Sequence, residues 1–196
     1  MEALIHLFIE IIKITIFTIV YSFIIVKLLE VISKKKPRSR LSFYLNNKII
    51  IRALRALISI VIFIGLFIWM FSFWGNHGFG DSARIPVGNK IAVENINWTE
   101  YGYIKKEQIS NAVNIETTRF KITGNKILGN FDSDFYTYQN KYFIFNTENK
   151  SMLEFKTVKE FDLYTEKNNL PSSDELLSFR ANYESYWHGW RFWLLP

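Results

Sequence analysis

The chain contains no cysteine among its 196 residues. Disulfide bonds, thiolate catalysis and cysteine-ligated zinc or iron–sulfur centres are therefore excluded. Its three histidines, His6, His77 and His188, are scattered and do not have the paired spacing of a zinc site. The glycines lack the Gly-Lys-Ser/Thr sequence that completes a phosphate-binding loop. We therefore expect neither a metal nor a cofactor.

Acidic residues are scarce in the first part of the chain. Residues 1–74 hold ten Lys/Arg and three acids, a net charge of +7 (10 − 3). Residues 75–196 hold fourteen Lys/Arg and fifteen acids, a net charge of −1 (14 − 15). A nucleic-acid-binding protein carries its positive charge on the folded domain itself. Here all the excess lies in the apolar half, so nucleic acid is excluded as a partner.

Two long segments lack charge altogether. Ile14–Val26 is uncharged, with apolar flanks that extend it to residues 11–32, and Ala56–Trp74 is nineteen residues without a charge. A helix that crosses a bilayer needs ~20 mostly apolar residues. The sequence therefore predicts two transmembrane helices and the lipid bilayer as a partner. A cleaved signal peptide is the alternative for the first segment, but that segment lacks a basic start and a small-x-small cleavage site.

The connection between these segments, residues 33–55, contains eight basic residues and no acid. Short loops rich in Lys and Arg remain in the cytoplasm, so both termini are expected outside. This topology predicts a multi-pass protein of the bacterial cytoplasmic (inner) membrane, with residues 1–10 and 75–196 extracytoplasmic, which means periplasmic in a Gram-negative cell. The basic residues that set the topology, and that also attract anionic lipid, include Lys34, Lys35, Lys36, Arg38 and Arg40.

Beyond Trp74 the composition becomes that of a folded domain. Residues 75–89 hold four of the nine glycines and predict a turn-rich collar. From residue 90 onwards apolar residues alternate with a period near two, and short polar turns such as Gly124–Asn125 separate the alternating segments. This pattern predicts an antiparallel meander of about five or six strands, with a bulge near Glu94–Asn95 where the alternation changes phase.

Two amphipathic helices are expected after the strands. Thr157 with Glu160, and Ser172 with Glu175, have the spacing of a capping box that begins a helix. The second helix carries an apolar stripe with steps of three and four residues, and Gly189 is where it would break. The stripe consists of Leu176, Phe179, Tyr183, Tyr186, Trp190 and Trp193. The expected fold class is therefore a membrane-anchored α+β protein, whose domain spans residues 90–196.

The C-terminal segment, residues 186–196, holds three of the six tryptophans. Its apolar stripe needs a cover, and three covers are open: the domain's own sheet, the outer leaflet, where Trp and Arg suit the headgroup region, or a partner protein. The candidate residues for contact with a partner or with the membrane interface are Trp187, Trp190, Arg191, Phe192 and Trp193.

One short polar cluster contains the residue types of a hydrolase. His77, Asp81 and Ser82 supply a base, a carboxylate and a hydroxyl, but the segment lacks the Gly-x-Ser-x-Gly spacing of a nucleophile elbow. Hydrogen bonds within a turn explain the same residues. We therefore expect a non-catalytic envelope protein whose domain binds a protein partner or a second copy of itself, as an accessory or assembly subunit of a membrane complex. An envelope hydrolase or transferase built on this cluster is the alternative.

Overall fold

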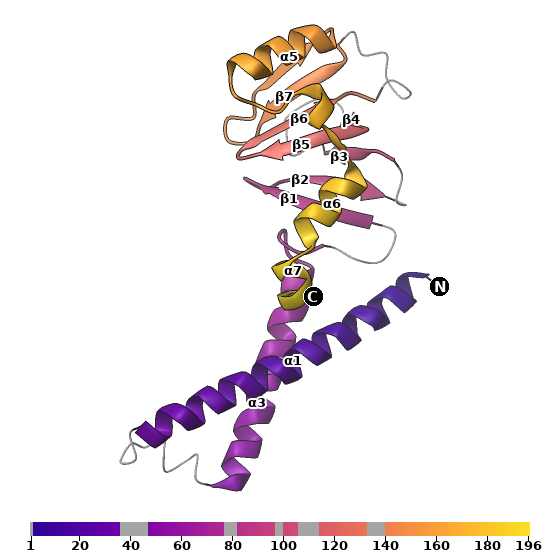
Figure 1. The fold of residues 1–196 in the computed structure, drawn as a ribbon. Coiled ribbons are helices and arrows are strands. Elements are labelled where there is room, and N and C mark those ends of the chain that lie inside the picture. The colour runs from indigo at the N-terminus through magenta and orange to yellow at the C-terminus, as the bar shows by residue number, and fades with distance from the viewer. Residues whose placement is uncertain (1, 36–46, 77–81, 97–99, 106–113, 133–139) are drawn as a thin grey trace.

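The computed structural model describes residues 2–35, 47–76, 82–96, 100–105, 114–132 and 140–196. Figure 1 shows a layered β domain at one end of the molecule and two long helices that cross each other at the other end. The expected α+β architecture is confirmed, because two long apolar helices precede antiparallel sheets and C-terminal helices.

The two long helices, α1 (Glu2–Lys35) and α3 (Lys48–Met70), pack against each other. Both are long and apolar enough to cross a membrane. The second helix is shorter at its end than predicted, because residues 71–74 form turns beyond Met70. Asn47 begins α3, since its side chain accepts hydrogen bonds from two backbone N–H groups of the first turn.

The strands form two antiparallel sheets, where the sequence predicted a single meander of five or six strands. Within the described residues, the sheets have the strand orders β1-β2-β3-β4 and β8-β7-β6-β5-β9. The first contains β1 (Ser82–Gly88), β2 (Ile91–Ile96), β3 (Gly102–Ile104) and β4 (Ile115–Thr117). The second contains β5 (Arg119–Thr123), β6 (Lys126–Asn130), β7 (Tyr142–Asn146), β8 (Met152–Phe155) and β9 (Leu177–Ser178).

Strand β1 corrects the prediction of a turn-rich collar at residues 75–89. Residues 82–88 pair with β2, and the tight turn follows only at Asn89 and Lys90. Both turn residues have positive φ angles, 52° and 61°, as a two-residue hairpin turn requires. The glycines and the proline of this segment therefore predicted turns, although residues 82–88 form an edge strand.

The predicted bulge at Glu94–Asn95 is wrong. The β1–β2 ladder is regular there and shifts its register between Pro86 and Gly88 instead. The change of phase has another cause, since every residue of Ile91–Asn95 is buried and no polar face has to alternate with an apolar one. The hairpin predicted at Gly124–Asn125 is confirmed between β5 and β6.

The main apolar core lies between the two sheets, and α6 (Phe179–Trp187) closes it at one side by contacting β1, β5 and β9. The first sheet contributes small and aliphatic side chains, and the second contributes mostly phenylalanine. Burying one such large side chain stabilises a fold by ~1.5–3 kcal/mol. The buried members are Ala83, Ile85, Ile91, Val93, Ile104, Ile115, Phe120, Ile127, Phe131, Phe143, Phe145 and Phe179.

Helix α5 (Val158–Lys167) covers the other face of the five-stranded sheet and lies at the end of the molecule farthest from α1 and α3 (Figure 1). Its Phe161 packs into a second, smaller core with Leu176. The predicted capping box of Thr157 and Glu160 is present at its start. Asn169 has a φ of 52° just beyond its end, a left-handed conformation of the kind that stops a helix.

The prediction of one continuous helix from Leu176 is wrong. The capping box of Ser172 begins only a three-residue turn, Ser173–Glu175. Leu177 and Ser178 then pair with β5 as strand β9, and α6 starts after that pairing. Pairing with the sheet therefore competes with the helix at this point and prevails.

The break predicted at Gly189 is confirmed. Helix α6 ends at Trp187, Gly189 has a φ of 73°, and a separate short helix α7 (Trp190–Leu194) follows. A left-handed φ suits glycine and stops a helix. The C-terminal segment is therefore divided into two parts with different surroundings.

Candidate functional site at the junction of the domain and the long helices

Trp187 joins the domain to the end of α3. Its side chain is buried, and its Nε1 donates a hydrogen bond to the backbone O of Arg84 in β1 at 2.8 Å. On its other side the ring meets Trp69 of α3 edge-on, with centroids 6.4 Å apart. Trp187 is therefore covered by the domain, one of the three surfaces considered for the C-terminal segment.

The short connection from α3 to β1 is fixed by its own contacts. Asn76 donates from its amide to the hydroxyl of Tyr183 and accepts a hydrogen bond from the backbone N of Arg84 at 3.3 Å. A Cβ at Gly75 would overlap the carbonyl of Met70, so only glycine fits there. Burial raises the pKa of the Tyr183 hydroxyl above its ordinary value of 10.0.

Helix α7 has a different environment from Trp187. Trp190, Phe192 and Trp193 are 58%, 54% and 72% exposed, so the protein itself does not cover them. Arg191 stacks its guanidinium 4.1 Å above the ring of Tyr186 and donates to the Tyr186 carbonyl at 3.1 Å. An arginine held among exposed aromatic rings is typical of a membrane interface or of a binding surface.

The same short helix reaches α1. The hydroxyl of Tyr21 donates to the backbone O of Leu194 at 2.5 Å. The Nζ of Lys13 lies 5.9 Å from the ring centroid of Phe192. Helix α7 therefore contacts α1, while Trp187 contacts α3, and the C-terminal segment joins both long helices to the domain.

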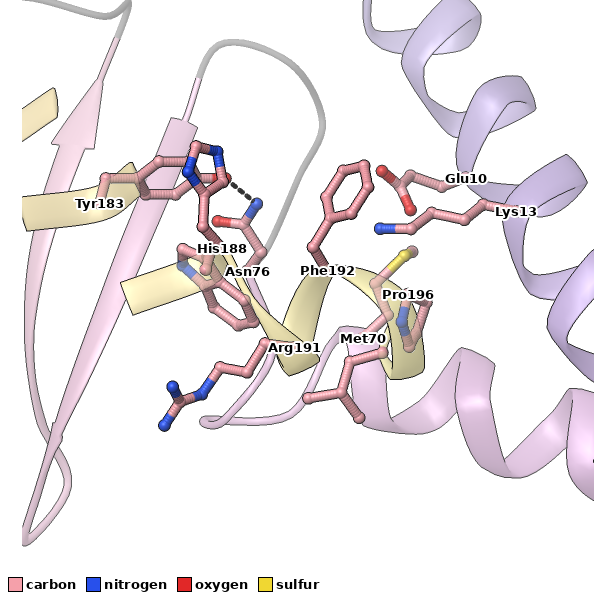
Figure 2. Close-up of a pocket in the computed structure, with 11 residues that line it drawn as sticks. Glu10, Lys13, Met70, Asn76, Tyr183, His188, Arg191, Phe192 and Pro196 are labelled. Carbon is pink, nitrogen blue, oxygen red and sulfur yellow. Dashed lines mark hydrogen bonds between the residues drawn. The ribbon is translucent and has the colours of Figure 1, made fainter. Parts of the chain in front are cut away.

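A cavity of about 250 Å³ lies at this junction. Figure 2 shows Glu10 and Lys13 reaching towards it from α1, with Tyr183 and His188 on the opposite side and the Arg191 guanidinium directed away. We call it the junction cavity. The residues that line it are Glu10, Lys13, Met70, Asn76, Tyr183, Trp187, His188, Arg191, Phe192, Leu195 and Pro196.

A second polar cluster, which the sequence does not predict, lies on the first sheet. The Glu94 carboxylate pairs with Arg84 at 2.5 Å and with Lys105 at 2.8 Å, and the Tyr103 hydroxyl donates to it at 3.4 Å. Cross-strand pairing of β1, β2 and β3 brings them together, which no short-range spacing reveals.

The charges of this cluster shift two pKa values in opposite directions. Burial alone would raise the pKa of the Glu94 carboxyl, but the hydrogen bond from Lys105 and the charge of Arg84 outweigh it, so this pKa is lowered. Burial, together with the Glu94 charge, raises the pKa of Tyr103 to about 12. The cluster is therefore an ionised carboxylate with its cations in place, an arrangement that ties three strands together.

The remaining predicted site residues are only partly described. Ser82 is the first residue of β1 and pairs with Ile96, while His77 and Asp81 lie outside the described residues. Lys34 and Lys35 form the basic last turn of α1, and Lys36, Arg38 and Arg40 lie outside the described residues. Within the described part of the chain, no group of three His, Asp or Glu side chains is arranged to hold a metal ion.

Comparison with known proteins returns no match. No family model matches the chain, and no curated protein and no solved structure matches it either. A function for this chain therefore follows only from its own sequence and geometry.

Proposed function

We propose that this chain is a non-catalytic protein of the bacterial cytoplasmic membrane. In this proposal α1 and α3 span the membrane and the α+β domain lies outside the cytoplasm. The domain binds a protein partner there, as an accessory or assembly subunit of a membrane complex. The observation that carries the proposal is the uncovered apolar surface of the two long helices.

The extent of that surface supports membrane helices rather than core helices of a soluble protein. None of the residues in the most apolar stretch of α3 is buried by the rest of the chain, and only 22% of those in the corresponding stretch of α1 are buried. Exposed Ile, Leu, Val and Phe side chains surround α1 from Leu4 to Ile32. Lipid supplies the missing cover, since the 23 residues of α3 extend for about 35 Å and cross a hydrocarbon core of about 30 Å.

The two ends of the helix pair differ in the way that membrane topology requires. Lys34 and Lys35 end α1 and Lys48 begins α3, so basic residues gather at one end. Tryptophans gather at the opposite end, where α3 meets the domain. Basic residues mark the cytoplasmic side and tryptophans mark the headgroup region, which supports an extracytoplasmic domain. The tryptophans concerned are Trp69, Trp74, Trp190 and Trp193.

This orientation assigns the exposed face of α7 to the outer leaflet. Trp190 lies beside Trp69 and Trp74 at the end of α3, and the rings of Trp190 and Trp193 are both exposed. Indole rings with a neighbouring arginine are favoured at the depth of the lipid headgroups. The surface for a protein partner is then expected elsewhere on the domain.

The open edge of the five-stranded sheet is our candidate for that surface. Strand β8 pairs with β7 on one side, and no described strand lies on its other side. An edge of this kind offers unpaired backbone N–H and C=O groups to an added strand. Leu153 in its centre is 45% exposed, so an extended apolar segment is the partner chemistry that fits.

A charge placed on this edge tests the proposal. Leu153→Lys should remove a partner that co-purifies with the full chain from detergent-solubilised membranes, because an edge lysine opposes strand addition. Leu163→Lys is the matched control, since Leu163 is also exposed, at 59%, and belongs to helix α5 and not to the edge strand. Both variants should still insert into the membrane. An edge variant that keeps every interactor of the unchanged chain would contradict partner binding at β8.

A further inference from the structure

We propose that the junction cavity binds the headgroup of a phospholipid that carries both a phosphate and a primary ammonium group. The proposal rests on the membrane placement proposed above. It assigns the ammonium to Glu10 and the phosphate to Lys13, the two opposite charges that α1 directs into the cavity.

Helix α1 carries two pairs of oppositely charged residues with the same spacing, and only one of them forms an ion pair among the described residues. Lys27 and Glu30, three residues apart, form an ion pair of 2.8 Å. Glu10 and Lys13 have the same separation, at which side chains on one helix face can meet, yet within the described residues neither takes part in an ion pair. Two opposite charges held apart beside a cavity are complementary to a ligand that bears both signs.

The surroundings of the Glu10 carboxylate and the Lys13 ammonium leave both groups incompletely satisfied, which favours the binding of a ligand. The Oε2 atom of Glu10 is buried and has no hydrogen-bond partner among the described residues. The ammonium of Lys13 lies 5.9 Å from the rings of Phe17 and Phe192, and rings compensate a desolvated cation only in part. A buried charge without a hydrogen bond is costly, and a bound ammonium–phosphate headgroup would satisfy both residues.

The depth of the cavity in the proposed membrane fits a headgroup. Lys48 and Met70, at the two ends of α3, are 22 residues apart (70 − 48), which corresponds to about 33 Å along a helix. This length matches a hydrocarbon core of about 30 Å. With Lys48 at the cytoplasmic surface, Met70 and the cavity that it lines together with Glu10 and Lys13 lie where the headgroups of the outer leaflet begin.

The size and lining of the cavity agree with this class of ligand. Its volume of about 250 Å³ is below the range of about 300–1,000 Å³ for pockets that enclose drug-sized ligands. Polar groups of Asn76 and His188 share the lining with Met70 and Phe192. A polar headgroup can therefore enter while its glycerol and acyl chains remain along the apolar helices.

The two charges also predict which lipids bind poorly. A choline headgroup carries a positive charge but no N–H to donate to Glu10. A glycerol headgroup leaves only the anionic phosphate, which the Glu10 carboxylate repels. An ethanolamine headgroup satisfies both residues, because charge-assisted hydrogen bonds form at each end.

Titration of the full chain in a non-ionic detergent with soluble dihexanoyl lipids tests this selectivity. The tryptophan fluorescence reports binding, because Trp187 lines the cavity. We expect phosphatidylethanolamine to bind about tenfold more tightly than phosphatidylcholine or phosphatidylglycerol with the same chains, the size expected for one hydrogen bond to a charged group. Equal affinity for all three lipids would overturn the proposal without any variant being made.

Two variants locate the effect. Glu10→Gln should abolish the preference for ethanolamine over choline, and Glu30→Gln at the far end of α1 should preserve it. Retention of the full preference by Glu10→Gln would also overturn the proposal. The membrane topology is measured separately by labelling in cells, so a failure of lipid selectivity is distinguishable from a failure of the proposed membrane placement.

Discussion

The indole Nε1 of Trp187 donates a hydrogen bond to the backbone O of Arg84, residues 103 positions apart in the chain. This bond links the end of α6 to β1, and the same ring packs edge-on against Trp69 of α3. A side chain that contacts the domain and a long helix at once determines how the two parts are joined. Trp187 is therefore a structural residue, while the aromatic residues of α7 remain exposed.

Trp187→Ala should destabilise the protein by about 3–5 kcal/mol, because it leaves a cavity and an unpaired carbonyl at the junction. Trp193→Ala should change the free energy of unfolding by less than about 0.5 kcal/mol, since its ring is 72% exposed. Chemical unfolding of both full-length variants in detergent measures the difference. Similar losses of stability in the two variants would contradict the division of the C-terminal segment.

The pair formed by Glu94 and Tyr103 should set both ends of the pH range of stability. The lowered pKa of Glu94 means that its contribution is complete above pH 4.5 and is lost as the pH falls through the folded-state value. The raised pKa of Tyr103 means that its contribution is complete below pH 10.0 and is lost as the pH rises towards about 12. Unfolding measured against pH should show both declines.

Variants separate these two contributions. Glu94→Gln should remove the part of the acid decline due to this carboxyl and bring the pKa of Tyr103 closer to its ordinary value. Tyr103→Phe should reduce the alkaline decline and leave the acid one in place. An alkaline profile unchanged in Tyr103→Phe would show that this hydroxyl does not titrate as inferred.

Gly102→Ala should destabilise the domain by about 1–3 kcal/mol through overpacking. An added Cβ would lie 2.8 Å from Cγ1 of Val93 and 2.9 Å from Cδ2 of Phe179, and both of these side chains are fully packed in the core. Gly65→Ala is the control, because nothing lies within 4 Å of a Cβ added there. The midpoint of thermal unfolding, measured for both variants, compares the effects of the two added methyl groups on stability. An unchanged midpoint for Gly102→Ala would contradict the packing of α6 on β3.

Substitution of the helix-capping residues tests how much each predicted capping box stabilises the fold. Thr157→Ala should cost about 1 kcal/mol, because it removes the bond from the Thr157 hydroxyl to the backbone N of Glu160 at the start of a ten-residue helix. Ser172→Ala should cost less, since its capping box supports only a three-residue turn. Equal costs, measured by unfolding, would show that helix length does not matter here.

Features that depend on neighbouring residues could be predicted from the sequence. The two apolar helices, the hairpin at Gly124, the capping box at Thr157 and the break at Gly189 each follow from a spacing of a few positions. Hydrophobic periodicity and backbone preference act over such distances. The predictions of these features were therefore correct without knowledge of the tertiary structure.

Features that depend on distant pairing could not be predicted in the same way. The division into two sheets, and the pairing of Leu177 with Phe120 that delays α6, arise from contacts between remote segments. The junction cavity likewise joins Glu10 of α1 to His188 near the C-terminus. The aromatic residues of α7 could be named from the sequence, but the three-residue spacing of Glu10 and Lys13 predicts only that the two can pair on one helix face, and it does not place them beside the C-terminal segment.

The location of the domain is the central claim, and labelling of single cysteines tests it most directly. The chain has no cysteine of its own, so Glu148→Cys in the exposed β7–β8 turn and Lys35→Cys at the end of α1 each provide one unique thiol. With a membrane-impermeant maleimide, Glu148→Cys should be labelled in bacteria whose outer barrier alone is opened, and Lys35→Cys only after the cytoplasmic membrane is permeabilised. Labelling of Lys35→Cys with protection of Glu148→Cys would contradict the proposed topology, and release of the protein from carbonate-washed membranes would contradict membrane insertion itself.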